Sequence, residues 1–307
     1  MPPADASPAP AGEAFPAVAF VGLGRMGWPM AGHLVAAGHR LIACDADAQR
    51  QQRFVGEVGG APLHDPSDLS SVAAVVLMLP TSAIVRDALL GAGDLAAGLA
   101  PGTVVIDMSS SVPRDTRELA AELAARGHSV VDAPVSGGVA RATDGTLTIM
   151  LGSDDEAAAQ LAERVVAPLS RQVFRTGGVG TGHAMKALNN FLAASAFVAT
   201  SQAIIAGREF GLAPEVMVDV INTSTGRSFI SELVMPTVLS EEFDTGFALG
   251  LLAKDVRIAQ DLIADVGPRS AVCDEVEARL SDAESALGSA ADHSRAFAHW
   301  SRRPTGP

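Results

Sequence analysis

Two lysines stand apart from the other positive charges of this chain. Its 307 residues include 22 Lys and Arg, and only Lys186 and Lys254 are lysine. Lys186 lies in the apolar stretch TGHAMKALNN, and Asn190 follows one helical turn later, so a helix would present both side chains from one face. A lysine amine whose pKa is lowered by burial or by neighbouring positive charge can exchange a proton, whereas arginine cannot. These residues therefore indicate proton transfer, such as the removal of a hydroxyl proton when an alcohol is oxidised.

A histidine offers a competing proton carrier. His183 precedes Lys186 by one turn. A 2-hydroxy acid dehydrogenase would combine such a histidine with an arginine that binds the substrate carboxylate, and nothing in the sequence pairs His183 with one. We therefore predict Lys186 as the proton carrier, with Asn190 on the same helix face and Asn189 close to it.

The turn FVGLGRMGWPM near the start of the chain is typical of dinucleotide binding. Gly22, Gly24 and Gly27 have the G-x-G-x-x-G spacing after a predicted strand and before a predicted helix. Such glycines allow the backbone to approach a pyrophosphate, which the N–H groups of the helix N-terminus bind. Asp45 ends the second predicted strand, where a carboxylate would accept from the adenosine ribose and repel a 2′-phosphate. The sequence favours NAD over NADP, although two arginines follow Asp45 closely.

The elements that must position these residues change character near residue 178. From Ala17 to about Gly178, short valine-rich runs alternate with helical stretches, which indicates a parallel sheet covered on both faces. Residues 183–210 then form one long segment that is too apolar all round for a surface helix. The predicted fold is α/β, an N-terminal Rossmann-like doubly wound sheet followed by an all-α C-terminal domain. The predicted boundaries are a disordered tail at 1–16, the dinucleotide-binding domain at 17–178, the all-α substrate and oligomerisation domain at 179–300, and a flexible tail at 301–307.

Composition narrows the classes of function. The net charge of −13 leaves no surface to neutralise nucleic-acid phosphates or to dock on an anionic membrane. Two cysteines cannot build a disulfide framework or a Cys-rich zinc site, and we expect no metal. The N-terminal segment lacks the basic start and apolar core of a signal peptide, and no uninterrupted apolar run predicts a membrane span. We expect a cytoplasmic protein with neither nucleic-acid nor membrane partners.

Five motifs in order give the chain a resemblance to the β-hydroxyacid dehydrogenase family, which includes 3-hydroxyisobutyrate dehydrogenase and tartronate semialdehyde reductase. The resemblance covers nearly everything from Ala17 to Trp300. The motifs are FVGLGRMGWPMAGHL, LMLPTS, VVIDMSSSVP, DAPVSGGVARATDGTL and the G-x-G-x-x-x-K-x-x-x-N pattern that starts at Gly180, and LLAKDV and ADHS follow.

The resemblance implies a role for each motif. Ser136, Gly137 and Gly138 would cradle the substrate carboxylate, because glycines let backbone N–H groups face a small anion and the serine adds a donor. Lys186 and Asn190 would be catalytic. Asn189 and Phe229 would contact the substrate. The residues implied at the cofactor are Gly22, Leu23, Gly24, Arg25, Met26, Gly27, Asp45, Leu79, Pro80, Ser110 and Lys254.

The predicted function is reversible NAD-dependent oxidation of a small 3-hydroxy acid to its semialdehyde or keto acid, by a homodimer or homotetramer. Three alternatives stay open. A 6-phosphogluconate dehydrogenase-like enzyme would need a much longer helical half, and an imine reductase usually lacks a lysine where Lys186 stands. A non-catalytic NAD-binding scaffold would have no need of Lys186 beside a carboxylate cradle. Arg141, inside the SGG segment, and Phe229 leave the particular acid undecided.

Overall fold

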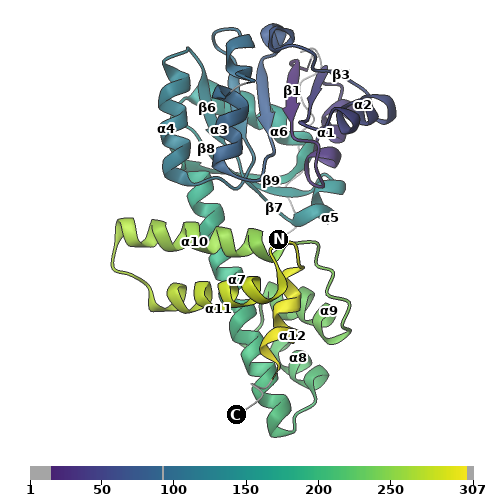
Figure 1. Cartoon of the computed structure of the whole chain (residues 1–307), viewed down its shortest axis with the longest axis vertical. Coiled ribbons are helices and arrows are strands. Elements are labelled where there is room, and N and C mark those ends of the chain that lie inside the picture. Colours follow the sequence, from purple (N-terminus) through teal and green to yellow (C-terminus); the bar gives the residue numbers. More distant parts are fainter. Residues whose placement is uncertain (1–14, 92, 303–307) are drawn as a thin grey trace.

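The computed structural model describes residues 15–91 and 93–302, so most of the two predicted tails lies outside the described residues. A sheet domain and a helical domain are stacked along the long axis, and helix α7 runs from one into the other (Figure 1). Phe15 and Pro16 were predicted in the tail but lie against the sheet domain. The Phe15 ring centroid is 4.8 Å from that of His39, and the Pro16 carbonyl accepts from His39 Nδ1 at 2.9 Å.

The first domain is built on a nine-stranded sheet of order β3-β2-β1-β4-β5-β6-β8-β7, with β9 paired to β8. The pairs among β1 to β6 are parallel, because each strand is followed by a crossover that returns the chain to the same edge. The strands are β1 (Val18–Val21), β2 (Leu41–Cys44), β3 (Ala61–Pro62), β4 (Ala74–Leu77), β5 (Val104–Asp107), β6 (Ser129–Asp132), β7 (Val135–Ser136), β8 (Leu147–Gly152) and β9 (Ser170–Gly177).

The sheet is not parallel throughout, which corrects the expectation from the sequence. β8 runs antiparallel to β6 and β7, and it is itself parallel to β9. The reason is the short connection from β7 to β8, which holds only α5 (Gly138–Thr143). A parallel crossover takes a dozen or more residues, so this connection reverses the chain instead. The reversal leaves the Ser136–Gly138 segment at the end of a short strand.

Helices cover both faces of the sheet and form a core on each. Strand β1 shows the two faces directly: Val18 and Phe20 belong to one core, and Ala19 and Val21 belong to the other, because side chains alternate along a strand. The helices of this domain are α1 (Gly27–Ala36), α2 (Ala48–Glu57), α3 (Ser82–Leu90), α4 (Pro113–Ala124) and α6 (Glu156–Val166), with short turns η1 (Pro66–Ser71), η2 (Leu95–Gly98) and η3 (Ala167–Leu169).

Helix α7 (Thr181–Phe210) is the axis of the second domain. It has 30 residues, and its most apolar 18-residue stretch has a mean hydropathy of 1.3, so it has the length and apolarity of a membrane-spanning helix. A core helix has the same character, and Phe197 and Ile204 pack in the core that α7 shares with α10 and α11. The other elements of this domain are α8 (Pro214–Asn222), η4 (Ile230–Val234), α9 (Met235–Leu239), α10 (Leu249–Val266), α11 (Ala271–Leu287), η5 (His293–Arg295) and α12 (Ala296–Trp300).

The junction of the two domains depends on the buried carboxylate of Asp132, at the end of β6. Its Oδ1 accepts the N–H of Gly180 at 2.7 Å, and its Oδ2 accepts the N–H of His183 at 2.9 Å. Both N–H groups belong to the start of α7, where backbone donors have no partner within the helix. Between them, a Cβ on Gly182 would collide with the carbonyl oxygen of Met150. The start of α7 is therefore held tightly against the sheet in one orientation.

We expect Asp132→Ala to lower the free energy of unfolding by about 2–6 kcal/mol, because it leaves two buried N–H groups without an acceptor at roughly 1–3 kcal/mol each. Urea denaturation followed by circular dichroism measures the loss. The control is Asp155→Ala, which removes the exposed cap of α6 and should cost about 1 kcal/mol. Equal losses in the two variants would mean that Asp132 acts only as an ordinary helix cap.

Candidate active site

The turn between β1 and α1 contains three glycines with different surroundings. Gly22 has φ 99°, and a Cβ there would collide with the backbone of Met78. A Cβ on Gly27 would collide with the carbonyl oxygen of Gly22, so internal packing requires glycine at both positions. A Cβ on Gly24 would have no atom within 4 Å. The middle glycine therefore faces open space just before α1, where a phosphate group can reach the free N–H groups of the helix.

The residues between these glycines divide into packed and exposed positions. Leu23 is buried, and its N–H donates to Asp45 Oδ2 at 2.7 Å. Met26 precedes α1 and packs against the core of the sheet domain. Arg25 is exposed, and its Nη2 lies 3.7 Å from the position that a Cβ on Gly246 would take in the helical domain. Of the three, only Arg25 offers its side chain at the junction of the domains.

Asp45 is more heavily engaged than the sequence indicated. Its side chain is 7% exposed, and besides Leu23 it accepts the N–H of Asp47 at 2.8 Å and Arg50 Nη1 at 3.1 Å. A carboxylate accepts about four hydrogen bonds, so little capacity is left. A ribose hydroxyl at the predicted position would share this carboxylate with Arg50.

Lys254 joins three segments of the chain. From α10, its Nζ donates to the carbonyl oxygen of Ser110 at 2.7 Å and to that of Pro80 at 3.0 Å, and it lies 3.4 Å from Asp255 Oδ1. Two of the three N–H donors of the ammonium therefore have a hydrogen-bond acceptor, and the contact with Asp255 is an ion pair. Lys254 therefore holds the loops after β4 and β5 against the helical domain and is poorly placed to carry a proton.

Lys186 and Asn190 lie one turn apart on α7. Asn190 is buried and donates from Nδ2 to Asp255 Oδ2 at 2.6 Å, while its Oδ1 accepts from Asn189 Nδ2 at 3.3 Å. In the described part of the chain, no hydrogen bond engages the Lys186 amine. Burial lowers the pKa of Lys186; the charge of Asp255 opposes this shift, and that of Lys254 adds to it. The Lys186 amine is thus available for proton transfer, with a pKa below its ordinary value.

Asp255 is a residue of the site that the sequence analysis did not name among the candidates. It is 2% exposed, hydrogen-bonds Asn190, and faces both lysines with its charge. The signal that could have identified it is a Lys-Asp pair inside the apolar helix LGLLAKDVRIA. A carboxylate at such a position needs partners, and the two lysines supply the opposite charge.

His183 supports a loop and does not face a ligand. Its side chain has no exposed surface, with Nδ1 2.8 Å from Thr116 Oγ1 and Nε2 3.1 Å from the carbonyl oxygen of Ser109. The Ser109 hydroxyl in turn accepts the N–H of Leu79 at 3.0 Å. His183 therefore links the start of α7 to the two loops that contain Leu79 and Ser109.

The Ser136–Gly138 segment has the geometry of an anion cradle. Gly137 has φ 134° and Gly138 has φ 65°, a region that favours glycine. Within the described residues, neither their N–H groups nor the Ser136 hydroxyl has a hydrogen-bond partner. A Cβ on Gly138 would meet nothing within 4 Å. Three neighbouring donors therefore remain available for a small anion.

Phe229 is an exposed residue of the helical domain. It lies at the start of η4 in the helical domain, and its side chain is 59% exposed. Its predicted contact with the substrate stays a prediction. Nor do residues 15–91 and 93–302 contain a group of three His, Cys, Asp or Glu side chains that could hold a metal ion.

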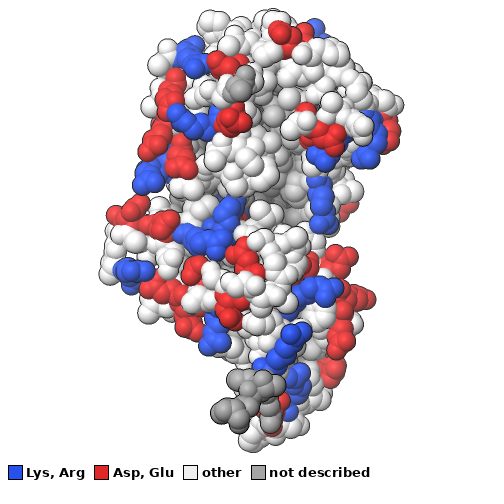
Figure 2. Space-filling view, viewed as in Figure 1, with Lys and Arg blue, Asp and Glu red and all other residues white. Residues whose placement is uncertain are grey.

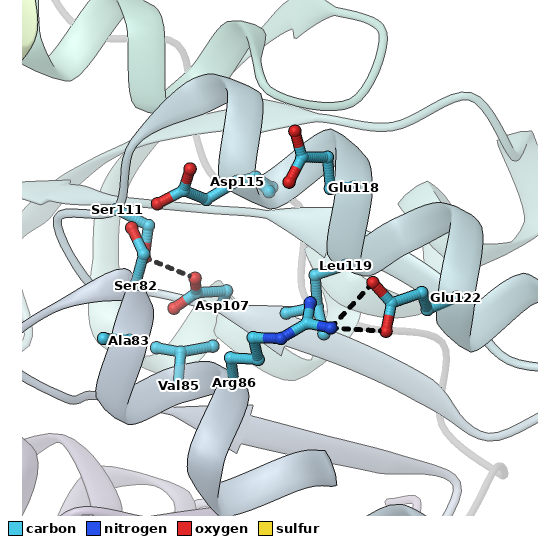
Figure 3. A pocket seen from close by; sticks show the side chains of 11 residues that line it. Ser82, Ala83, Val85, Arg86, Asp107, Ser111, Asp115, Glu118, Leu119 and Glu122 are labelled. Carbon is cyan, nitrogen blue, oxygen red and sulfur yellow. Dashed lines mark hydrogen bonds and ion pairs between the residues drawn. The ribbon is translucent and has the colours of Figure 1, made fainter. Parts of the chain in front are cut away.

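A separate cavity of about 300 Å³ lies between α3 and α4 (Figure 3). Its lining includes the carboxylates of Asp107, Asp115, Glu118 and Glu122, and its one cation, Arg86, already pairs with Glu122 at 2.7 Å. Such a lining repels an anionic ligand. None of the predicted catalytic residues borders it, so we place the candidate active site at the junction of the domains.

Comparison with known proteins gives matches over both domains. Residues 17–178 match the family described as the NAD binding domain of 6-phosphogluconate dehydrogenase, and residues 180–300 match the NAD-binding domain of NADP-dependent 3-hydroxyisobutyrate dehydrogenase. The chain is 34% identical over 243 residues to 2-(hydroxymethyl)glutarate dehydrogenase of Eubacterium barkeri, covering 79% of this chain and 80% of that protein. It is 36% identical over 253 residues to the mitochondrial 3-hydroxyisobutyrate dehydrogenase of Homo sapiens, covering 80% and 74%. The solved structure of Mycobacterium tuberculosis 3-hydroxyisobutyrate dehydrogenase with L-serine superposes with a TM-score of 0.86 at 29% identity, covering 93% and 99%.

We expect two substitutions to shift the pKa of Lys186 in opposite directions. Lys254→Met removes a neighbouring positive charge and should raise it, and Asp255→Asn removes a negative charge and should lower it. An electrophilic reagent labels only the neutral amine, so the pH midpoint of labelling reports this pKa. Peptide mass spectrometry resolves the Lys186 peptide easily, because the chain has only two lysines.

In the unsubstituted protein the labelling midpoint of Lys186 should lie below the ordinary value of 10.5. The N-terminal amine of the same molecules is the internal control, and its midpoint should not move between variants. Shifts of Lys186 in the same direction in both variants would contradict the electrostatic coupling described above.

Proposed function

This chain belongs to the β-hydroxyacid dehydrogenase family, oxidoreductases that act on CH–OH groups, and from that premise we propose that it oxidises a small 3-hydroxy acid reversibly to its semialdehyde or keto acid. The observation that carries the proposal is the Lys186 amine. It has no hydrogen-bond partner in the described chain, its pKa is lowered, and it shares a helix face with Asn190.

Binding in this proposal begins at the anion cradle. The Ser136 hydroxyl and the N–H groups of Gly137 and Gly138 donate to the substrate carboxylate. Because β6, which leads into this cradle, also holds the start of α7 through Asp132, the cradle and Lys186 keep a fixed relation. A small acid bound by its carboxylate would then present its hydroxyl to the amine.

Proton transfer is assigned to Lys186. In its neutral form the amine accepts the hydroxyl proton during oxidation, and in its charged form it protonates the carbonyl oxygen during reduction. The charge of Asp255 attracts the protonated amine, and Asn190 holds Asp255 through its hydrogen bond at 2.6 Å. When bound, a nicotinamide dinucleotide supplies the hydride acceptor or donor. The residues that would hold it are those of the turn around Gly24, Asp45, and the loops that Lys254 fixes.

We propose NAD as the preferred cofactor, with NADP used less well. The carboxylate of Asp45 would repel a 2′-phosphate, and this supports the preference. Arg50 lies 3.1 Å from Asp45 and offsets part of that repulsion, so the discrimination should be moderate.

We propose a homodimer or homotetramer, and exposed apolar side chains of the helical domain support this association. These side chains include Phe210, Val216 and Leu192, at 87%, 59% and 62% exposure. Association of copies would remove such surface from water, and sedimentation analysis would report a monomer if this is wrong. We also propose a cytoplasmic location, which the low cysteine content supports, and fractionation of the producing cells checks this.

Lys186→Arg should lower kcat by about a hundredfold or more, because arginine keeps the charge but cannot release the proton. Absorbance of reduced nicotinamide measures the rate with NAD or NADP and a panel of 3-hydroxyisobutyrate, 2-(hydroxymethyl)glutarate and L-serine. Arg114→Lys, an exposed exchange on α4, is the control and should leave the rate unchanged. Turnover that survives Lys186→Arg would remove the proton role from Lys186. Binding of NAD without turnover of any acid would favour a scaffold.

Two further substitutions should move the cofactor preference in opposite directions. Arg50→Gln removes the cation beside Asp45, so the ratio of kcat/KM for NAD to that for NADP should rise. Asp45→Asn removes the repelling charge, and the ratio should fall by roughly tenfold, about 1.4 kcal/mol. The same ratio in both variants would show that these side chains do not contact the adenosine ribose.

A further inference from the structure

Arg141 is an unpaired cation beside the proposed anion cradle. It is exposed on α5, and its guanidinium makes no ion pair or hydrogen bond with the described residues. Many arginines of this acidic chain are held by carboxylates; for example, Arg86 pairs with Glu122 at 2.7 Å and Arg175 with Glu163 at 2.6 Å. Arg141 is one of several arginines, Arg25 and Arg171 among them, whose charge no carboxylate of the described residues neutralises.

The stem of Arg141 lies directly on the cradle. Its Cβ, Cγ and Cδ are 2.7, 3.0 and 2.5 Å from the position that a Cβ on Gly137 would take. Helix side chains tilt toward the helix N-terminus, so a residue four positions on covers the backbone that precedes it. Gly137 is the residue that makes room for this stem. The guanidinium is therefore carried at the rim of the Ser136–Gly138 segment.

The cradle does not need Arg141 for a single carboxylate. It already offers the Ser136 hydroxyl and the N–H groups of Gly137 and Gly138, as described above. An exposed guanidinium is also a poor neighbour for an alkyl substituent, because covering it removes water without supplying an acceptor. A carboxylate in the same place would satisfy the planar guanidinium with two parallel hydrogen bonds.

We propose that Arg141 binds a second carboxylate, carried on the C2 substituent of the 3-hydroxy acid, so that dicarboxylic acids are the preferred substrates. This inference rests on the proposed function, which sets where the first carboxylate lies. It assigns the choice of substrate to a residue that takes no part in proton transfer.

The test compares 2-(hydroxymethyl)glutarate with its C5 carboxamide, which has the same size but lacks the second charge. Arg141→Met keeps an unbranched stem over Gly137 and removes the guanidinium. We expect kcat/KM for the dicarboxylate to fall about tenfold or more, mainly through KM, as for a charge-assisted hydrogen bond. With the carboxamide, kcat/KM should fall less than about threefold, since a hydrogen bond from Arg141 to a neutral acceptor is weaker than one to a carboxylate. For the dicarboxylate, kcat/KM of Arg141→Lys should lie between those of the unsubstituted enzyme and Arg141→Met, because lysine keeps the charge but lacks the planar guanidinium.

The matched control is Arg114→Met, which removes an exposed charge from α4 and should leave both rates unchanged. Equal losses with both substrates in Arg141→Met would mean that Arg141 binds the first carboxylate, and the inference would be wrong. A preference of the unsubstituted enzyme for the carboxamide would also overturn it, while the proposed function stood. If no 3-hydroxy acid is oxidised at all, the proposed function fails, and this inference fails with it.

Discussion

The site depends on one buried interaction, the carboxylate of Asp132 with the backbone at the start of α7. The two N–H groups that it accepts fix both the position and the rotation of a helix that carries Lys186 one turn later. Burial raises the pKa of Asp132, while the nearby His183 and these hydrogen bonds oppose the shift. The strand that ends in Asp132 leads within four residues to Ser136. One carboxylate thus sets the relation between the proposed proton carrier and the proposed anion cradle.

The two lysines carry the same amine, but their different surroundings give them different roles. Lys254 donates to two carbonyl oxygens and pairs with Asp255, so it holds two loops against α10. Burial and the positive charge of Lys254 both disfavour the protonated form of Lys186 and lower its pKa. Asp255 lies between them and limits that shift. Burial, which is the largest cause of the shift, still leaves the pKa of Lys186 below its ordinary value.

The protein has a net charge of −13, so it can bind anionic ligands only where local groups offset this repulsion. In Figure 2, residues of both charge signs are interspersed over the surface. Ion pairs such as Arg86–Glu122 neutralise part of this charge locally. At the site, binding depends instead on backbone N–H groups freed by Gly24 and by Gly137 and Gly138, which carry no net charge. Unpaired cations such as Arg141 add attraction only where a ligand carboxylate can reach them. Anion binding is thereby limited to the few positions that offer these donors, although the net negative charge of the protein repels anions at long range.

The sequence by itself determined the features that depend on near neighbours: the valine-rich strands, the glycine turn, and the spacing of Lys186 and Asn190 on one helix face. It missed β3, which is two residues long, and the reversal of β8. Only the tertiary structure decided the partners of the charged groups. Lys254 and Pro80 are 174 residues apart, and Asp132 and Gly180 are 48 apart. Periodicity reports which face of an element is apolar, whereas the partner of a buried charge is set by how distant elements pack, and no local pattern encodes that.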